Sequence, residues 1–224
     1  MEEVIRLDNV VKMAEDGRRV IGGVSFSVME RECVTIRGAS GSGKTILARL
    51  IAGLDKQSAG QIHVLGRPVH KMKRDDASEF INKNIGILPR NPAFLDNLTL
   101  YYNLAMALVI QGQTPSQWRI RVREQLNEMG LLYAANAHPP QLTPLERHKA
   151  AIARALAGSP KILLLDDFAA DLSIADVDEI KATLHAICRY GTYTVVELTN
   201  ANARLICHDR TLTLDHGKIQ EETR

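Results

Sequence analysis

Residues 38–45 read GASGSGKT and decide the fold of this chain. The stretch fits the phosphate-loop pattern G-x-x-x-x-G-K-[ST] at every specified position. Residues 33–37 before it alternate as a β-strand does, and residues 46–52 after it carry apolar side chains at helical spacing up to Gly53. The motif requires a strand, a loop and a helix in this order. The sequence therefore predicts a nucleotide-binding site.

The loop offers several groups that suit a chain of phosphates. Gly41 and Gly43 let backbone N–H groups approach phosphate oxygens at the N-terminus of the helix. Lys44 is expected to reach the β- and γ-phosphates of ATP, and the Thr45 hydroxyl is expected to hold Mg²⁺. A glycine-rich turn that matches by chance is the alternative, and the flanking strand and helix argue against it. The predicted nucleotide-binding residues of this stretch are Gly38, Ser40, Gly41, Ser42, Gly43, Lys44, Thr45 and Ile46.

The composition narrows the class of protein. The chain of 224 residues is long enough for one sizeable domain, and its formal net charge is only +2. Basic residues are scattered and aromatic residues are few, so we expect no nucleic-acid partner. Neither a signal peptide nor an apolar stretch of the ~20 residues that a membrane helix needs is expected. The separate cysteines, without a C-x-x-C pair, are interpreted as thiols in a reducing compartment: Cys33, Cys188 and Cys207.

Hydrophobic periodicity predicts strands that alternate with helices. Residues 4–7 and 24–28 predict a small antiparallel sheet. Residues 71–80 are interpreted as a solvated segment, and residues 94–148 are expected to be helical throughout. Strands that alternate with helices around a phosphate loop indicate a parallel α/β core. Further strands are expected at 61–66, 85–88, 161–166 and 194–198, a hairpin at 211–219, and helices at 98–110, 117–129, 143–157 and 176–190.

A second motif lies at residues 162–167, which read ILLLDD. In phosphate-loop ATPases such a strand ends beside the loop, and its terminal carboxylate helps to hold Mg²⁺. We therefore expect Asp166 at the metal and Asp167 where an acid activates the attacking water. An apolar core strand that merely ends in acid is the alternative, and the phosphate loop earlier in the chain favours the functional interpretation of Asp166.

Over nearly its full length the chain resembles the ATP-binding subunits of ABC transporters. It is most similar to the branch that serves lipoprotein release, macrolide export and cell division. The resemblance rests on the order and spacing of residues 38–45, 85–88, 92–99, 151–156 and 160–167.

The resemblance implies a fold and a working assembly. One domain, residues 1–224, is expected to combine a phosphate-loop ATPase core with a parallel sheet (1–90 and 149–224), an antiparallel β subdomain and an inserted helical subdomain at about 91–148. Two such subunits, identical or sister chains, close head to tail around two ATP molecules with Mg²⁺ at the cytoplasmic side of the membrane. The transmembrane permease that they drive is expected to dock at Phe94, Leu95, Asn97, Leu98 and Tyr101.

Several positions depart from the family pattern. Met13 stands where the family has an aromatic residue that stacks on adenine, and a thioether packs on a base without a π face. Arg90 replaces a glutamine whose carbonyl oxygen ligates Mg²⁺ or its water, whereas an arginine only donates hydrogen bonds. Arg90 is either a cation for the γ-phosphate or a solvated charge on a loop.

The family's L-S-G-G-Q stretch, which contacts ATP across the dimer, aligns with residues 142–146, which read LTPLE. The glycines that allow backbone contact with phosphate are absent, and Leu145 adds bulk. Thr143, Pro144 and Glu146 instead suit the first turn of a helix. We expect a structural helix cap here and no phosphate clamp.

Two catalytic positions and one interface position complete the comparison with the family. Asp167 takes the place of the catalytic glutamate and is one methylene shorter. Misplacing a general base by about 1 Å can cost ~100-fold in rate, so slow hydrolysis is expected. Asn200 replaces a histidine that contacts the γ-phosphate, and its amide donates a hydrogen bond without carrying charge. Asp171 keeps a carboxylate where the family crosses the dimer interface.

Three functions fit these residues. The first is an ATP-driven motor subunit of a membrane ABC complex, with Lys44 and Asp167 as its catalytic residues. The second is a nucleotide-gated subunit that closes on ATP, scarcely hydrolyses it and pairs with a more active sister. The third is a soluble phosphate-loop kinase, which needs an acceptor site and an arginine-bearing lid that the sequence does not indicate. The transported substrate and its direction are not readable from these residues.

Overall fold

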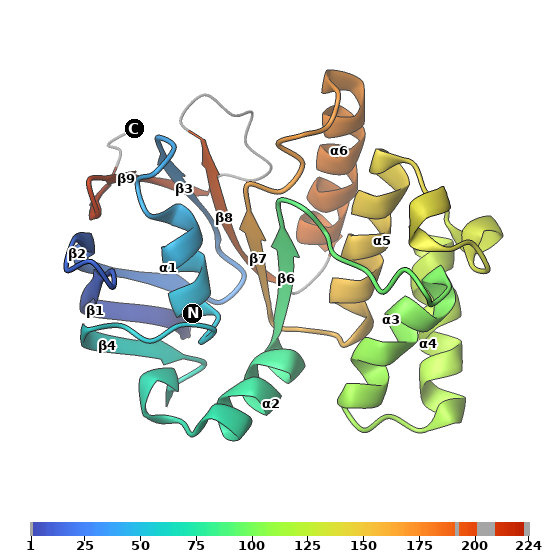
Figure 1. Cartoon of the computed structure of the whole chain (residues 1–224), viewed down its shortest axis with the longest axis horizontal. Coiled ribbons are helices and arrows are strands. Elements are labelled where there is room, and N and C mark those ends of the chain that lie inside the picture. Colours follow the sequence, from blue (N-terminus) through green and yellow to red (C-terminus); the bar gives the residue numbers. More distant parts are fainter. Residues whose placement is uncertain (1, 191–192, 201–208, 222–224) are drawn as a thin grey trace.

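The computed structural model describes residues 2–190, 193–200 and 209–221. These parts of the chain form two β-sheets with helices between and beside them (Figure 1). One sheet has six strands and the other has four. Strands and helices alternate along most of the chain, which confirms the expected α/β class.

The larger sheet is the parallel core. Its strands are β3 (Cys33–Gly38), β6 (Ile85–Pro89), β7 (Ile162–Asp166), β8 (Thr194–Asn200), β9 (Arg210–Asp215) and β10 (Lys218–Glu221). They lie in the order β10-β9-β3-β8-β7-β6, and only the β9–β10 hairpin is antiparallel. Nearly every residue of β3, β7 and β8 is buried, as is typical of strands covered on both faces.

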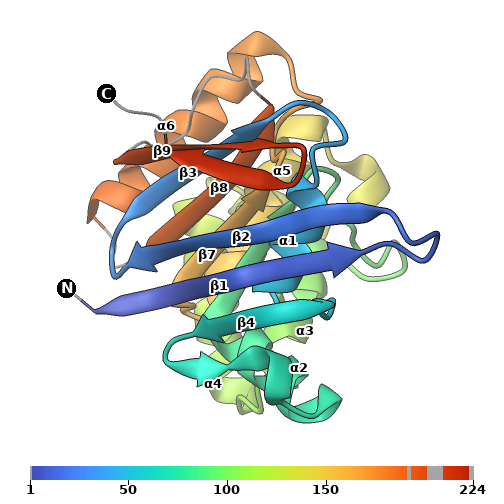
Figure 2. The same cartoon turned by 90° about the vertical axis from the view of Figure 1, so that its left-hand side faces the viewer.

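The smaller sheet is antiparallel. It consists of β1 (Glu3–Met13), β2 (Arg19–Met29), β4 (Ala59–Val64) and β5 (Arg67–Pro68), in the order β2-β1-β4-β5. Figure 2 shows β1, β2 and β4 side by side on one flank of the molecule. The pairing of β1 with β2 confirms the antiparallel sheet that the N-terminal alternation predicts.

Helix α1 (Lys44–Ile51) follows the phosphate loop directly and lies between the two sheets (Figure 1). Its residues Leu47, Leu50 and Ile51 are buried in one core with Val34 and Ile36 of β3. Burying a side chain of this size contributes about 1.5–3 kcal/mol. The packing therefore fixes the helix whose N-terminus meets the loop.

Helices α3 (Leu100–Ile110), α4 (Pro115–Glu128) and α5 (Pro144–Ala157) pack against one another beside the larger sheet, and α6 (Ile174–Tyr190) packs beside α5. A second core lies among them. Between α4 and α5 the chain makes only the 3₁₀ turns η2 (Leu132–Ala134) and η3 (Pro139–Gln141). The expectation of helix throughout residues 94–148 was therefore wrong at 94–99, 111–114 and 129–143, where turns and loops join the helices.

Residues 71–80 are largely exposed, as expected of a solvated segment, but most of them lie in a helix that was not predicted. The 3₁₀ turn η1 (Val69–Lys71) leads into helix α2 (Arg74–Asn84). Ala77 and Ile81 of this helix are buried, and a Cβ atom on Gly53 would lie 2.7 Å from Cδ1 of Ile81. Two buried anchors in an otherwise polar helix leave a weak periodic pattern, so the sequence does not reveal it.

The cysteines differ in part from the expectation of free thiols. Cys33 is disulfide-bonded, so its interpretation as a thiol was wrong. Spacing along the chain does not show which sulfur atoms a fold brings together. Cys188 is a free thiol, and burial raises its pKa to about 11, which makes it unreactive. Cys207 lies outside the described residues.

Candidate nucleotide-binding site

The register of the parallel strands brings the predicted site residues to one edge of the larger sheet. Gly38 at the end of β3 pairs with Asn200 at the end of β8. Asp166 at the end of β7 pairs with Pro89 at the end of β6, and Arg90 follows directly. Ligand sites of open parallel sheets form beyond the carboxyl ends of the strands. The phosphate loop, the acidic motif and Arg90 therefore face one space although they are far apart in the sequence.

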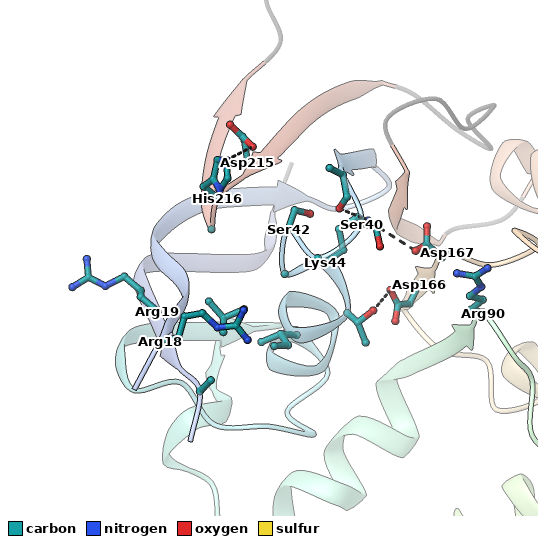
Figure 3. Close-up of a pocket in the computed structure, with 18 residues that line it drawn as sticks. Arg18, Arg19, Ser40, Ser42, Lys44, Arg90, Asp166, Asp167, Asp215 and His216 are labelled. Atoms are coloured by element: carbon teal, nitrogen blue, oxygen red, sulfur yellow. Dashed lines mark hydrogen bonds and ion pairs between the residues drawn. The ribbon is translucent and has the colours of Figure 1, made fainter. Parts of the chain in front are cut away.

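A cavity of about 790 Å³ opens at this edge (Figure 3). Its lining includes residues 39–46 of the loop and helix, together with Arg90, Asp166 and Asp167. Its volume suits a small-molecule ligand. Of the predicted nucleotide-binding residues, Met13, Gly38 and Asn200 are not part of this lining. The antiparallel sheet and the C-terminal hairpin supply the other wall: Ala14, Arg18, Arg19, Val20, Asp215, His216 and Gly217.

The backbone of the loop depends on two glycines. Gly41 and Gly43 adopt φ angles of 80° and 105°, in the left-handed region. A Cβ atom on Gly43 would also come within 2.9 Å of Cδ1 of Ile21. Gly43 is the N-cap of α1, and within the described structure no side chain caps this end and no acid stands in its first turn. The helix therefore meets the cavity with N–H groups that suit a phosphate.

Lys44 is held at the centre of the loop with only 5% of its surface exposed. Its Nζ donates hydrogen bonds to the carbonyl oxygens of Gly38 (3.0 Å) and Ala39 (3.1 Å) and to Oδ1 of Asn200 (3.3 Å). The nearest carboxylate oxygen is Oδ2 of Asp167, 3.9 Å away. Neutral oxygens thus hold the cation in place, and Asn200 contacts the site through Lys44.

Thr45 and Asp166 meet where the metal is expected. Thr45 Oγ1 donates a hydrogen bond of 3.1 Å to Oδ1 of Asp166. Burial raises the pKa of Asp166, and the neighbouring carboxylate of Asp167 raises it further. A bound cation would stabilise both charges. Hydroxyl and carboxylate oxygens are ligands that Mg²⁺ prefers, so the donor set fits this ion.

Asp167 opens the turn after β7. Its φ of 47° lies in the left-handed region, which is strained for a non-glycine residue, and its N–H donates a 2.8 Å hydrogen bond to the carbonyl of Leu198. Its Oδ1 is buried and has no hydrogen-bond partner among the described residues. Leaving such an atom unsatisfied costs about 1–3 kcal/mol. A water molecule in the cavity would satisfy it.

The far end of the cavity holds residues that the sequence analysis missed. Arg18 and Arg19 come from the turn before β2 and from its first residue, and His216 comes from the turn between β9 and β10. In Figure 3, Arg18 points toward the loop and Arg19 points away from it. The N–H of Met13 donates to Ser58 Oγ at 2.9 Å, and its neighbour Ala14 lines the cavity. The two adjacent arginines in the polar turn after Met13 were the sequence feature that could have indicated this wall of the cavity.

Arg90 forms an ion pair with Asp171. Its Nε donates a 2.8 Å hydrogen bond to Oδ2, and its Nη2 donates a second one to Oδ1. The pairing raises the pKa of Arg90 and lowers the pKa of Asp171. Arg90 also lines the cavity on the side of Asp167 (Figure 3). Arg90 is thus a half-exposed charge on a loop, paired with Asp171, that also borders the cavity, so both alternatives for it stay predictions.

Residues 142–146 form the start of α5. Thr143 Oγ1 accepts a hydrogen bond of 3.3 Å from the N–H of Glu146, and Glu146 Oε2 accepts one of 2.7 Å from the N–H of Thr143. Pro144 occupies the first helical position, and the Tyr133 hydroxyl donates to Glu146 Oε1. This reciprocal capping box confirms the expected structural helix cap.

Four of the predicted docking residues lie in an irregular segment that leads into α3, and Tyr101 lies in the first turn of that helix. The buried side chain of Asn103 holds this segment: its Oδ1 accepts from the N–H of Leu95 at 2.8 Å. Its Nδ2 donates to the carbonyl oxygens of Leu95, Leu98 and Thr99 at 3.1 Å each. Of the five predicted residues, Leu95 and Asn97 are exposed. The other three are half-buried: Phe94, Leu98 and Tyr101.

Together, the parallel sheet, the intact loop and the acidic strand end beside it define a phosphate-loop nucleotide-binding domain. Residues 21–170 match the family described as ABC transporter. The chain belongs to this family, as one of its ATP-binding domains, which are ATPases. The resemblance that the sequence motifs carry is thereby confirmed.

Relatives and solved structures agree with this assignment. The chain is 29% identical to the lipoprotein-releasing system ATP-binding protein LolD of Chromohalobacter salexigens, over 99% of this chain and 94% of that protein. It is 30% identical to LolD of Xylella fastidiosa, over 98% and 93%. The dimeric post-hydrolysis structure of the ATP-binding cassette MJ0796, bound to ADP and Pi, aligns with a TM-score of 0.86 at 26% identity, over 97% of this chain and 98% of that chain.

Another solved structure supports the fold alone. It is cbiO1 from Clostridium perfringens, part of the ABC transporter complex cbiONQ, with a TM-score of 0.87 at 22% identity over 98% of this chain and 88% of that chain. The similarity to LolD confirms the lipoprotein-release branch, and the MJ0796 match confirms the phosphate-loop ATPase fold.

Proposed function

We propose that this chain is the ATP-driven motor subunit of a lipoprotein-release type membrane complex and that it hydrolyses ATP slowly. The intact phosphate loop carries the proposal, with Lys44 buried at its centre and Thr45 hydrogen-bonded to Asp166. The LolD relatives, named as ATP-binding proteins of a lipoprotein-releasing system, support the choice of complex.

The proposed metal is Mg²⁺, held by Thr45 and Asp166. When bound, Mg²⁺ neutralises charge on the β- and γ-phosphate oxygens. A ligating carboxylate must be deprotonated, and a bound cation would offset the burial and the neighbouring Asp167 charge that raise the pKa of Asp166.

Three side chains are proposed to act on the γ-phosphate. Lys44 binds phosphate oxygens and stabilises charge in the transition state. Asp167, through its unpartnered Oδ1, accepts a hydrogen bond from the attacking water and orients it. Asn200 accepts from Lys44 through Oδ1, which leaves its amide N–H groups to donate to a phosphate oxygen. The short Asp167 side chain accounts for slow turnover.

The nucleoside is proposed to lie at the opposite end of the cavity. The γ-phosphate belongs near Asp166 and Asp167, so the base belongs beside the antiparallel sheet. Met13 remains a candidate for packing on the base. Arg18 is an added candidate because its guanidinium points into the cavity and can stack on a base (Figure 3).

Two subunits are proposed to close head to tail around ATP, and the dimeric structures of the MJ0796 cassette support this arrangement. The capping box favours a second candidate function, a nucleotide-gated subunit with little hydrolysis. Pro144 and Leu145 stand where the family's glycines contact phosphate, and Glu146 adds an acid, so this chain offers a partner's ATP a poor clamp. A sister subunit with a glycine-rich clamp would then complete the site at this chain's phosphate loop.

The membrane partner is proposed to dock on the helical subdomain, residues 91–148, at Phe94, Leu95, Asn97, Leu98 and Tyr101. The core, 1–90 and 149–224, completes a single domain over residues 1–224, and α5 runs across the boundary. No helix within the described residues is long and apolar enough to cross a bilayer. Peripheral attachment at the cytoplasmic side, through this partner, is therefore part of the proposal.

Calorimetric binding of MgATP tests the proposal. We expect Lys44→Ala to weaken binding by about tenfold or more, because a charge-assisted contact is lost. Lys149→Ala is the matched control, since Lys149 also forms an ion pair, with Glu179, but lies outside the cavity. No binding by the wild type, or equal binding by wild type and Lys44→Ala, would contradict the proposal.

A further inference from the structure

Arg90 lines the nucleotide cavity while a carboxylate outside the lining holds it. Arg90 follows β6, and Asp171 lies 81 positions later, in the turn between β7 and α6. Asp171 is the only hydrogen-bond partner of Arg90 within the described ranges. The two side chains are about half exposed, at 50% and 46%.

The pair uses the planar fork of the guanidinium. Two N–H groups, Nε and Nη2, each donate to a different carboxylate oxygen of Asp171. The same fork matches two oxygens of a phosphate group. An exposed ion pair is weak in water, so a more highly charged anion can replace the Asp171 carboxylate as the partner of Arg90.

The position of Arg90 makes such an exchange possible. The cavity wall that contains Arg90 also contains Asp166 and Asp167, where the γ-phosphate is proposed to lie. The carboxylate of Asp167 adds to the attraction of the arginine toward this wall, which contributes to the raised pKa of Arg90. The guanidinium thus stands between Asp171 on one side and the phosphate end of the cavity on the other.

We propose that Arg90 senses the γ-phosphate and that Asp171 binds the Arg90 guanidinium when no γ-phosphate is present. The terminal phosphate of ATP takes the guanidinium from Asp171, whereas ADP lacks that phosphate and leaves the pair closed. The exchange releases the turn that contains Asp167, Ala169 and Asp171 from its ion pair with Arg90. In this turn the φ angle is 47° at Asp167 and 71° at Ala169, both in the left-handed region. This inference rests on the proposed function, because it requires ATP in the cavity.

Variants at the two positions are expected to change ATP affinity in opposite directions. Arg90→Met removes the sensor and should weaken binding of a non-hydrolysable MgATP analogue by about tenfold. Asp171→Asn removes the competitor and should tighten binding by about threefold, because more of the arginine is free to bind. MgADP affinity should stay unchanged in both variants. The double variant should behave as Arg90→Met alone.

The measurement is calorimetry on the full chain, at concentrations where sedimentation shows a monomer. Arg6→Met is the matched control, because Arg6 forms a similarly exposed ion pair with Asp8 outside the cavity. If the ion pair only stabilises the structure, both variants should change the affinity for the MgATP analogue in the same direction. That result, or no change in affinity, would overturn this inference and leave the proposed function standing. A wild type that binds neither nucleotide would overturn the proposed function and the inference with it.

Discussion

Lys44 Nζ and Asp167 Oδ2 lie 3.9 Å apart beneath the phosphate loop, too far for a hydrogen bond. Carbonyl oxygens of the loop hold Lys44, and a main-chain hydrogen bond fixes the turn that carries Asp167. Each charged group is therefore positioned by backbone rather than by the other. A phosphate group could therefore bind Lys44, and an attacking water could bind Asp167, without a movement of either side chain.

At the same scale, Arg18 is predicted to contact the base and not the phosphates. Arg18→Ala should weaken MgATP binding by about three- to tenfold through loss of stacking, and should leave binding of Mg-tripolyphosphate unchanged. Arg19→Ala is the control, because Arg19 points away from the loop (Figure 3). Competition against a fluorescent nucleotide measures both ligands. Equal weakening of ATP and tripolyphosphate, or no weakening of either, would show that Arg18 does not contact the base.

Single residues were predictable where a motif fixes their spacing. The loop residues and Asp166 follow from two short patterns, and the structure brings Thr45 and Asp166 into hydrogen-bond contact. Arg18 reaches the cavity from the other sheet, and Asp171 reaches Arg90 across 81 positions of chain. No local pattern encodes such contacts, because they depend on how the sheets and turns pack.

At the scale of an element, the start of α5 is a local stabilising device. We predict that Thr143→Ala lowers the free energy of unfolding by about 1 kcal/mol, because the N–H of Glu146 loses its acceptor. Thr143→Ser, which keeps the hydroxyl, should restore most of the stability. Urea unfolding at neutral pH measures the difference, and equal midpoints for wild type and Thr143→Ala would contradict the assignment of the cap.

The same cap has a pH signature. Hydrogen bonds from the Tyr133 hydroxyl and the Thr143 backbone hold the pKa of Glu146 below its ordinary value. The carboxylate therefore adds stability that is complete above the unfolded pKa and is lost as the pH falls through the folded one. Glu146→Gln keeps a side-chain acceptor without the ionisation. The stability advantage of wild type over this variant should shrink as urea titrations move to acid pH.

Elements were predictable where their determinants are local. The residues that cap α5 are adjacent in the chain, so its first turn was predicted correctly. Helix α2 buries chiefly Ala77 and Ile81, and its remaining polar sequence resembles a loop. The loop before α3 is ordered by Asn103, whose partners are backbone groups that a sequence pattern does not display.

At the scale of the whole molecule, two sheets enclose one helix and share one cavity. The parallel sheet supplies the phosphate end, and the antiparallel sheet and C-terminal hairpin supply the far wall (Figures 1 and 3). The alternation of strands and helices was enough to predict the class. The strand order β10-β9-β3-β8-β7-β6 arises from packing between segments that are far apart in the chain, so the pattern did not contain it.

The central claim is that an intact phosphate loop drives slow ATP hydrolysis despite the altered residues around it. Single-turnover formation of ADP from MgATP tests it most directly, with the subunit alone and in its purified membrane complex and with Lys44→Ala as control. We predict ADP from the wild type, none from Lys44→Ala, and a rate about 100-fold or more lower in Asp167→Asn, which loses the base. Tight ATP binding without ADP in either preparation would contradict the claim and leave a nucleotide-gated subunit.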